Sequence, residues 1–430
     1  MTSPAGIWSL LSATRRRNRE QWYGPDRLRE LRQRRLRRLA EAASRTAHYR
    51  EAFRHAGVDP AELTSEDALR RLPLLEKATL QERGREMMLT QPVETLGVLT
   101  TSGSTGVPLR IFRSARDQGE VSALWARLWR AYGRGPFDRQ VNIGSGRAAV
   151  KAGPVAALRK FGVLPELQQL SSFDPADRQI ALLRQVKPHV LSGYAVALEL
   201  AAEAVLAAGV RDIRPRIVHS GSMVLTERCR ALCKEAFGVA PLDVYATIEC
   251  GPLAWECPVS GGLHLNDDVQ IVEIVDDAGR PVPDGEPGHV VVTQLNCTAE
   301  PLIRYRVGDI ASRLPQRCSC GRGLGLLGLM QGRSQHTIRT PDGRVLTTAM
   351  IAVIMGALPQ VRRYQVRQTG PTDLRILVVP SGEWTPAGAD AIRRGFDERL
   401  GAGLHCDVVP VDDIPLAPSG KFQTVVPLEG

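Results

Sequence analysis

The sequence contains no apolar run that approaches the roughly 18 residues needed to cross a bilayer. Its short apolar patch at residues 7–11 is followed, not preceded, by arginines, which is the wrong order for a secretory signal. We therefore expect a cytoplasmic protein with no membrane partner. In that compartment the eight cysteines would be free thiols or metal ligands and not disulfides.

Lysine is also scarce: only six of the 56 lysine and arginine side chains are lysines. The net charge of +10 therefore rests mainly on arginine, and eleven arginines lie between residues 15 and 38. Leucines recur there at an approximately helical spacing, at Leu28, Leu31, Leu36 and Leu39. No zinc-finger, RNA-recognition or helix-turn-helix signature accompanies the arginines. We therefore predict a solvated, charged helix face and no nucleic-acid partner.

The length of 430 residues favours two or three domains. Residues 1–90 have mostly helical patterns, and residues 95–300 alternate strand-length apolar runs with helical stretches, as α/β domains do. Two of those runs, residues 269–275 and 289–294, are predicted to pair as a hairpin. We predict an α/β fold with a large N-terminal domain of mixed sheets and helices at residues 1–334. A small, mobile C-terminal α+β domain would follow at residues 335–430.

A Gly/Ser/Thr-rich loop at residues 100–108 has the composition of a phosphate cradle. Glycines let backbone N–H groups turn toward anionic oxygens, and small hydroxyl groups add donors without crowding them. The loop lacks the Gly-Lys-Ser sequence that opens a helix in the common nucleotide-binding loop. Alone it is weak evidence, because such clusters also form ordinary turns.

Four further motifs follow in the order Tyr245 to Glu249, Asp309, Gly332-Arg333 and Lys421. A tyrosine at a strand end can stack on a purine, and a glutamate beside a triphosphate can hold Mg²⁺. An aspartate in a turn can accept hydrogen bonds from ribose hydroxyls. Each motif alone fits a capped turn or a core tyrosine, but the five together indicate ATP chemistry.

In this order the motifs resemble the adenylate-forming enzymes, which include acyl- and aryl-CoA ligases and peptide-synthetase adenylation domains. Within them the chain resembles the phenylacetate-CoA ligase-like branch, and the resemblance covers nearly the whole sequence. It implies an ATP- and Mg²⁺-dependent ligase that converts a carboxylic acid, with an aromatic acid favoured, to an acyl-adenylate with release of pyrophosphate. The acyl group would then pass to CoA or, as an alternative, to an amine.

The resemblance assigns roles to individual residues. The phosphate-binding set would be Thr101, Ser102, Gly103, Ser104, Thr105 and Gly106, with Thr105 also catalytic. Tyr245 and Ala246 would contact adenine, Asp309 the ribose, and Arg333 the ribose or a phosphate. Glu249 would bind Mg²⁺. Lys421 would reach the substrate carboxylate and the α-phosphate, where a cation is needed because two anions are brought together. The acyl pocket would draw on Ile143, Gly144, Tyr194, Ser222 and Met223.

The chain departs from the family at several positions. Val107 stands where many members have a lysine, and Gln335 and His336 replace the acidic residues usual after the Gly-Arg hinge. The stretch at residues 221–223 reads Gly-Ser-Met in place of Gly-Ala-Glu, and the Glu-Ile-Glu tail common in CoA ligases is absent. Adenylation is therefore better supported than CoA transfer.

Four potential zinc ligands are spaced through the later part of the chain: Cys257, His264, Cys318 and Cys320. Three thiols and one imidazole suit tetrahedral zinc, and a site with four protein ligands would be structural. Some members of the branch carry zinc in the matching region. Cys250 is near enough in sequence to replace one ligand. The remaining cysteines are predicted to be core thiols: Cys229, Cys233, Cys297 and Cys406.

Two other functional classes remain as alternatives. A non-catalytic binding protein could retain the fold, although it would have no need of Lys421 and Glu249. A hydrolase could use His219 as a base, but no Gly-x-Ser-x-Gly motif supplies a nucleophile. We therefore expect His219 to be structural.

Overall fold

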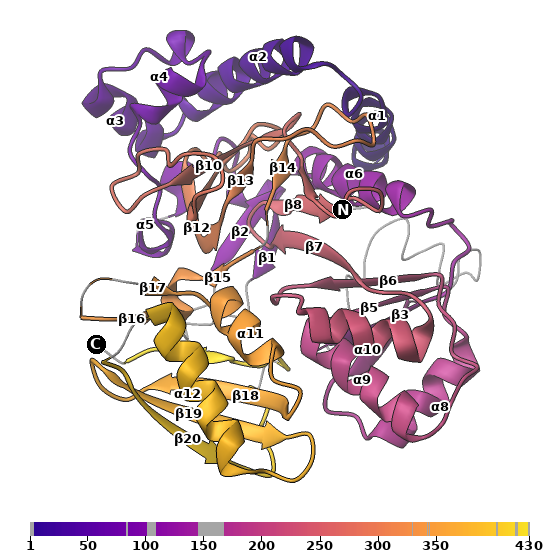
Figure 1. Cartoon of the computed structure of the whole chain (residues 1–430). Coiled ribbons are helices and arrows are strands. Elements are labelled where there is room, and N and C mark those ends of the chain that lie inside the picture. Colours follow the sequence, from indigo (N-terminus) through magenta and orange to yellow (C-terminus); the bar gives the residue numbers. More distant parts are fainter. Residues whose placement is uncertain are drawn as a thin grey trace.

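The computed structural model describes residues 4–82, 85–100, 109–144, 167–328, 330–341, 343, 345–400, 403–417 and 420–428. Helices of the N-terminal segment form one layer, the large sheets lie beneath it, and the C-terminal part lies against the opposite side (Figure 1). The arrangement confirms the predicted α/β class, with a small α+β unit at the C-terminal end.

The N-terminal segment is helical, as its sequence pattern predicts. Its helices are α1 (Pro4–Glu20), α2 (Pro25–Ala43), α3 (Ala47–Ala56), α4 (Glu66–Arg70) and α5 (Lys77–Glu82), with short 3₁₀ turns at Pro60–Glu62, Arg85–Met88 and Val93–Thr95. The predicted leucine stripe of α2 is buried. Helix α3 begins at Thr46, whose side chain accepts a hydrogen bond from the Tyr49 backbone N–H, and ends at Gly57, whose φ of 58° suits glycine.

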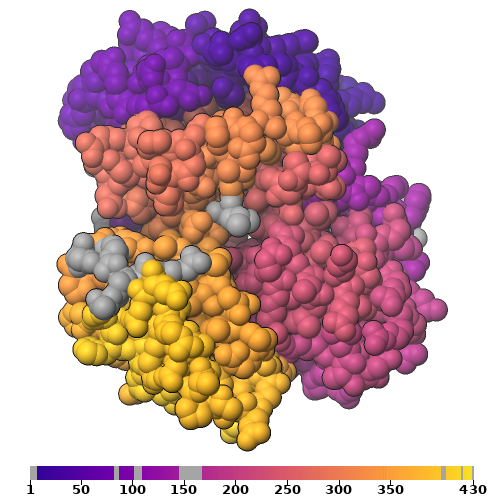
Figure 2. All heavy atoms as spheres, viewed as in Figure 1, coloured from indigo at the N-terminus to yellow at the C-terminus, as the bar shows by residue number. Residues whose placement is uncertain are grey.

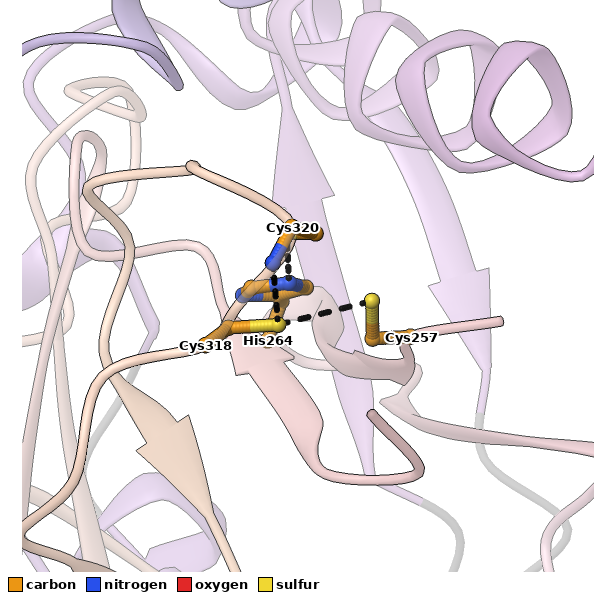
Figure 3. Close-up of side chains that lie close together, drawn as sticks. All are labelled: Cys257, His264, Cys318 and Cys320. Atoms are coloured by element: carbon orange, nitrogen blue, oxygen red, sulfur yellow. Dashed lines mark hydrogen bonds between the residues drawn. The ribbon is translucent and has the colours of Figure 1, made fainter. Parts of the chain in front are cut away.

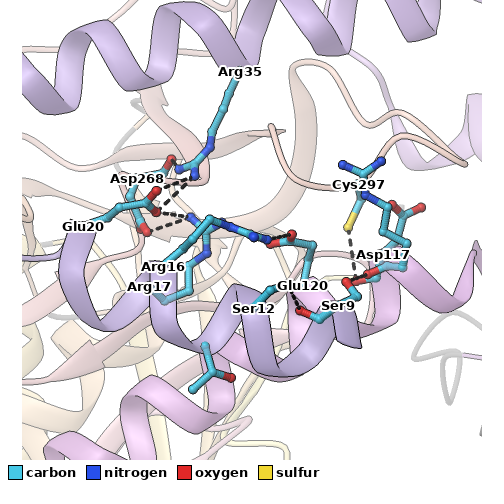
Figure 4. Close-up of polar contacts among 12 residues, drawn as sticks. Ser9, Ser12, Arg16, Arg17, Glu20, Arg35, Asp117, Glu120, Asp268 and Cys297 are labelled. Carbon is cyan, nitrogen blue, oxygen red and sulfur yellow. Dashed lines mark hydrogen bonds and ion pairs between the residues drawn. The ribbon is translucent and has the colours of Figure 1, made fainter. Parts of the chain in front are cut away.

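The expectation of a wholly solvated arginine face is wrong for Arg17 and Arg35. Arg17 is 1% exposed and pairs with Glu20 at 2.6 Å, with Asp268 at 3.1 Å and with Glu120 at 3.1 Å. Arg35 pairs with Glu20 at 2.9 Å (Figure 4). Arg17 is buried and Arg35 is half-buried. Each charge has an opposite partner, which offsets the cost of removing it from water.

The largest sheet has nine strands in the order β13-β14-β9-β8-β7-β6-β5-β3-β4. Its strands are β3 (Gln140–Gly144), β4 (Leu167–Ser171), β5 (Val190–Gly193), β6 (Ile217–Gly221), β7 (Leu242–Thr247), β8 (Gly251–Glu256), β9 (Leu263–Leu265), β13 (Arg313–Leu314) and β14 (Leu326–Leu327). The strands from β4 to β7 are parallel, and β8, β9, β14 and β13 continue the sheet antiparallel.

Helices cover both faces of the parallel strands. Helices α8 (Ala176–Val186), α9 (Ala195–Ala207) and α10 (Glu227–Phe237) bury one face in a core that includes Val141, Leu198 and Val218. Helix α6 (Ala115–Ala131) covers the other face, where Leu128 packs with Val190 and Val244. The carboxyl ends of the parallel strands remain as an edge where loops can build a site.

Smaller sheets surround this layer. Strands β10 (Gln270–Val275), β11 (Gly288–Gln294), β12 (Tyr305–Ala311) and β15 (Gly332–Arg333) form an antiparallel sheet. The predicted hairpin of residues 269–275 and 289–294 is confirmed, because Gln270 pairs with Gln294. Strands β1 (Gly97–Thr100) and β2 (Arg110–Arg113) form a separate antiparallel pair.

The C-terminal unit has a four-stranded sheet in the order β20-β19-β18-β21, packed against two helices (Figure 1). Its elements are β16 (Ile338–Arg339), β17 (Val345–Leu346), α11 (Thr348–Gly356), β18 (Val361–Gln368), β19 (Asp373–Pro380), α12 (Pro386–Leu400), β20 (His405–Pro410) and β21 (Val425–Val426). It meets the large part of the chain beside α9, where the Arg362 guanidinium lies 2.9 Å from the Glu203 carboxylate. The C-terminal unit lies directly against the lower face of the larger part in Figure 2.

No helix in the described ranges is both long and apolar enough to cross a membrane.

Candidate active site

The carboxyl edge of the parallel strands collects several of the predicted residues. Gly144 ends β3, Tyr194 follows β5, and Ser222 follows β6. A Cβ atom placed on Gly144 would lie 3.8 Å from the Tyr194 ring, so these two predicted pocket residues are neighbours. Ser222 is exposed and has a φ of 68°, a left-handed conformation that is uncommon for a residue other than glycine. Such strained positions often occur beside ligand sites.

The Ile143 side chain does not join this group. It alternates with Gly144 along β3, so it points to the opposite face of the sheet, where it is fully buried in the core formed with α8, α9 and α10. Met223 is partly buried against the same core. The positions of the Ile143 and Met223 side chains therefore do not support the prediction that they line the acyl pocket.

Tyr245, Asp309 and Arg333 converge where β7, β12 and β15 meet. The Tyr245 hydroxyl donates to Asp309 Oδ2 at 2.9 Å, and Arg333 Nε lies 3.6 Å from Asp309 Oδ1. Asp309 and Arg333 are also register partners of β12 and β15. Burial raises the pKa of Asp309, although Arg333 and the Tyr245 hydrogen bond oppose that rise. The Asp309 carboxylate is therefore held in a fixed direction at the sheet junction.

Glu249 lies just after β7 and is 9% exposed. The Tyr305 hydroxyl donates to Glu249 Oε1 at 3.2 Å. Arg113 Nη2 donates to the backbone carbonyl oxygens of Ile248 and Glu249, at 2.7 and 3.0 Å. Sequence reasoning missed Tyr305 and Arg113 as residues that hold this carboxylate, because their contacts cross 56 and more than 130 positions of the chain.

Lys421 reaches the same edge from the C-terminal unit. Its ammonium group lies 5.5 Å from the centroid of the Tyr194 ring. The preceding peptide is held by Ser172, whose hydroxyl donates to the Gly420 carbonyl oxygen at 3.4 Å. Burial lowers the pKa of Lys421, and Arg333 lowers it further, whereas the Asp309 carboxylate acts to raise it. Lys421, Arg333 and Asp309, which were predicted from separate motifs, are therefore close enough to affect one another electrostatically.

Part of the predicted site lies outside the described residues. This holds for the phosphate-binding set, Thr101, Ser102, Gly103, Ser104, Thr105 and Gly106, and for Val107. The flanking strands β1 and β2 are described, and they pair with Thr100 opposite Arg110. Ala246 lies within β7 beside Tyr245, and its backbone is paired with Pro252 of β8.

The four predicted metal ligands come together at the antiparallel end of the large sheet (Figure 3). Their ligand atoms all lie within 4.8 Å of one another. The Cys257 and Cys318 sulfurs are 3.6 Å apart, and His264 Nε2 is 3.2 Å from the Cys320 sulfur. A tetrahedral zinc site with bonds of about 2.3 Å would place two sulfurs roughly 3.8 Å apart, so the arrangement fits zinc.

Cys250 is not part of that cluster. It is buried in the core beside Glu249, and its carbonyl oxygen accepts hydrogen bonds from Gln270 at 3.1 Å and from Gln294 at 3.0 Å. The suggestion that it could replace a zinc ligand is therefore wrong. The predicted core thiols Cys229, Cys233 and Cys297 are buried, and Cys406 is half-buried.

His219 is not hydrogen-bonded to a nucleophile in the described part of the chain. Both of its ring nitrogens are buried there without a hydrogen-bond partner, and its ring meets Trp129 edge-on at 4.7 Å. Burial and, to a lesser degree, Arg134 lower its pKa to about 3. The hydrolase alternative, in which His219 activates a serine, therefore finds no support in this geometry.

The family model of the CapK C-terminal domain matches residues 338–427. Among curated proteins, the phenylacetate-coenzyme A ligase of Thermus thermophilus is 26% identical over 445 residues, which cover 94% of this chain and 97% of the relative. A crystal structure of 2-hydroxyisobutyryl-CoA ligase in the postadenylation state has a TM-score of 0.78 at 20% identity and covers 95% of this chain and 91% of that one.

The same ligase in its thioesterification state gives a TM-score of only 0.63 at 21% identity, over the same shares of the two chains. Over the whole chain, the present structure is thus more similar to the postadenylation structure of that ligase than to its thioesterification structure. Over nearly its whole length the chain is thus similar in sequence to a phenylacetate-coenzyme A ligase, and its fold is that of a solved 2-hydroxyisobutyryl-CoA ligase.

Proposed function

We propose that the protein activates a carboxylic acid with ATP to form an acyl-adenylate and pyrophosphate, and then transfers the acyl group to CoA. The observation that carries this proposal is the meeting of Lys421 with Tyr194 at the carboxyl edge of the parallel strands, beside the Tyr245, Asp309 and Arg333 group. A mobile cation, an aromatic face and a fixed carboxylate are the groups that a bound acid and nucleotide require.

In the first step the substrate carboxylate attacks the α-phosphorus of ATP, and the bond to pyrophosphate breaks. Two anions approach in this step, so the Lys421 ammonium group stabilises the charge that develops between them. Burial removes water from this ammonium group and so lowers its pKa from an ordinary value near 10.5, and a bound anion would replace the lost solvation. Asp309 accepts from the ribose hydroxyls, and Arg333 binds the ribose or a phosphate, which fixes the nucleotide for in-line attack.

The carboxylate of the buried Glu249 would hold Mg²⁺. A bound Mg²⁺ would neutralise charge on the phosphates. Tyr305 and Arg113 support Glu249 by fixing its carboxylate and its backbone. The residues of the loop at 101–106 bind the β- and γ-phosphates. The Cys257, His264, Cys318 and Cys320 cluster would hold a structural zinc, which would tie the loop before β14 to the large sheet.

The second step uses a different position of the C-terminal unit. Residues 335–430 form the moving part, and the residues after Arg333 form the hinge. The unit places Lys421 in the site for adenylation, and its rotation withdraws Lys421 before the acyl group passes to the CoA thiol. The higher similarity to a postadenylation structure supports the first of these positions.

The test is a pyrophosphate-release assay with ATP, Mg²⁺ and a panel of aryl, alkyl and amino acids, each with and without CoA. Acid-dependent release together with a CoA-dependent thioester supports the proposal. Release with no thioester would overturn the CoA step and favour an amine or other acceptor. Silence over the whole panel, with ATP binding intact, would contradict ligase activity and favour a binding protein.

A further inference from the structure

A row of polar side chains crosses the parallel strands on the face that α6 covers. The Asn142 amide donates to Gln169 Oε1 at 2.9 Å, and the Ser192 hydroxyl donates to Asn142 Oδ1 at 2.9 Å. Gln140 Nε2 donates to the Ser192 hydroxyl at 3.1 Å. These residues lie on β4, β3 and β5. Buried parallel strands are normally apolar on both faces, so a polar row there needs a reason.

His219 continues this row onto β6. It is the register partner of Ser192, as Ser192 is the partner of Asn142, and paired residues lie on the same face of a sheet. Both His219 ring nitrogens are buried and have no hydrogen-bond partner within the described residues. A buried polar group left without a partner costs about 1–3 kcal/mol, and such groups usually mark a binding partner or a functional site.

The position of the row fits the far end of a bound acid. Gly144 lies two residues beyond Asn142 on β3, toward the carboxyl edge, which is a step of about 6.6 Å along a strand. Gly144 is beside Tyr194, whose ring lies under the Lys421 ammonium group. A carboxylate at Lys421 thus directs the body of its molecule toward Gly144, and a Cβ atom placed there would lie 3.4 Å from Asn142 Nδ2, so the polar row is the next group along that direction.

The surroundings indicate the shape and charge of that molecule. Trp125 and Trp129 of α6 stack on one another with ring centroids 5.8 Å apart, and Trp129 contacts His219. Flat aromatic walls suit an aromatic ring. The row itself has no charged member, because its amides and hydroxyl are neutral and His219 is neutral at physiological pH. Arg134, which lies over Trp129 at 4.8 Å, is the nearby cation.

We propose that the polar row of Asn142, Ser192 and His219 recognises an uncharged hydrogen-bonding group, such as a hydroxyl, on the aromatic ring of the substrate acid at the end remote from its carboxylate. This inference rests on the proposed adenylation function and narrows its substrate. His219 presents one N–H donor and one acceptor nitrogen, so one of these nitrogens can donate to a hydroxyl or accept from it, whereas an unsubstituted ring would leave both nitrogens unpaired.

The experiment compares two matched pairs of acids in the pyrophosphate-release assay: benzoate with 4-hydroxybenzoate, and phenylacetate with 4-hydroxyphenylacetate. We expect kcat/KM to be at least tenfold higher for the hydroxylated member of the better pair. The variants His219→Phe and Asn142→Leu should each reduce that ratio to less than threefold. His405→Phe, which alters an exposed histidine on β20, should keep it.

The outcomes separate the two proposals. Pyrophosphate release with equal kcat/KM for both members of each pair overturns the specificity inference and leaves the ligase function standing. A preference that survives in His219→Phe and in Asn142→Leu also overturns it, even if each variant is less active. Should one variant fail to fold, as judged by circular dichroism, the other still decides the matter. No release with any acid contradicts the ligase function, and the specificity inference with it.

Discussion

Asp268 is the residue on which the buried ion pairs of the N-terminal helices depend. Its side chain is fully buried and pairs with Arg17 at 3.1 Å and with Arg127, also fully buried, at 3.0 Å. Replacing Asp268 by Asn keeps the shape and removes the charge. Two guanidinium groups then lose a partner from which water is excluded, and only Glu20 and Glu120 remain to compensate Arg17.

The size of the effect follows from burial. Removing one member of a buried ion pair costs about 3–5 kcal/mol, whereas an exposed pair contributes only about 0.2–1 kcal/mol. The matched control is therefore Arg29→Gln on α2, because Arg29 and Asp26 are 62% and 86% exposed. The free energy of unfolding should fall by roughly 4 kcal/mol per M of guanidinium chloride. Asp268→Asn should therefore lower the denaturant concentration at the unfolding midpoint by about 1 M. The control should move it by less than about 0.25 M.

Acidification tests the same network. Burial acts to raise the pKa of Asp268, but Arg127 and Arg17 outweigh it, so the folded-state pKa lies below the ordinary value of 3.8. The stabilisation is then present above that ordinary value and is lost as pH falls through the lowered folded-state pKa. In denaturation curves from pH 7 to pH 3, the gap between the wild-type and Asp268→Asn midpoints should be full at pH 7 and should begin to narrow only as the pH falls below 3.8. Two results would refute the reasoning. One is an equal unfolding midpoint for wild type and Asp268→Asn at pH 7, and the other is a shift in Arg29→Gln as large as that in Asp268→Asn.

Other perturbations address the site. Lys421→Ala should lower the adenylation rate about a hundredfold or more while ATP binding persists, and a loss of only a few-fold in a pyrophosphate-exchange assay would contradict its role. Arg362→Gln removes the ion pair that joins the C-terminal unit to Glu203, worth about 0.2–1 kcal/mol, so the ratio of adenylation to thioester-formation rates should fall about 1.4- to 5-fold. An unchanged ratio, with both half-reactions measured separately, would show that the pair does not hold the adenylation position. Metal analysis should find about one zinc per chain and far less in Cys318→Ser, and a metal content near zero in the wild type would exclude the zinc site.

Much of the fold could be predicted because its elements have local signals. Helix α3 is marked by Thr46 and Gly57 at its ends, and the β10–β11 pair by alternation on both sides of a turn. The metal ligands were likewise visible from residue type and spacing. Exclusion of Cys250 required the three-dimensional positions, because its nearness in sequence says nothing about which way its thiol points.

The features that escaped prediction depend on distant partners. Nothing in the local pattern separates Arg17 from Arg16 or Arg19, because its partner Asp268 is 251 positions away. The polar row was missed for a related reason. Strand β3 lies between β4 and β5 in the sheet, so the contact of Asn142 with both Gln169 and Ser192 depends on strand order, which hydrophobic periodicity does not determine.

Helix α1 and the turn after it acquire two of their polar partners late in synthesis. Arg17 can pair with Asp268 only after residue 268 has been made. Gln21 accepts a hydrogen bond at 3.0 Å from Arg322, which is 301 positions further along the chain. At about 5–20 residues per second, a ribosome needs roughly 15–60 s to add those 301 residues. During that interval Arg17 has only Glu20 and, once it has been added, Glu120 as acidic partners. The order in which the chain emerges therefore makes completion of this buried ion network, by Asp268, a late step in assembling the large part of the molecule.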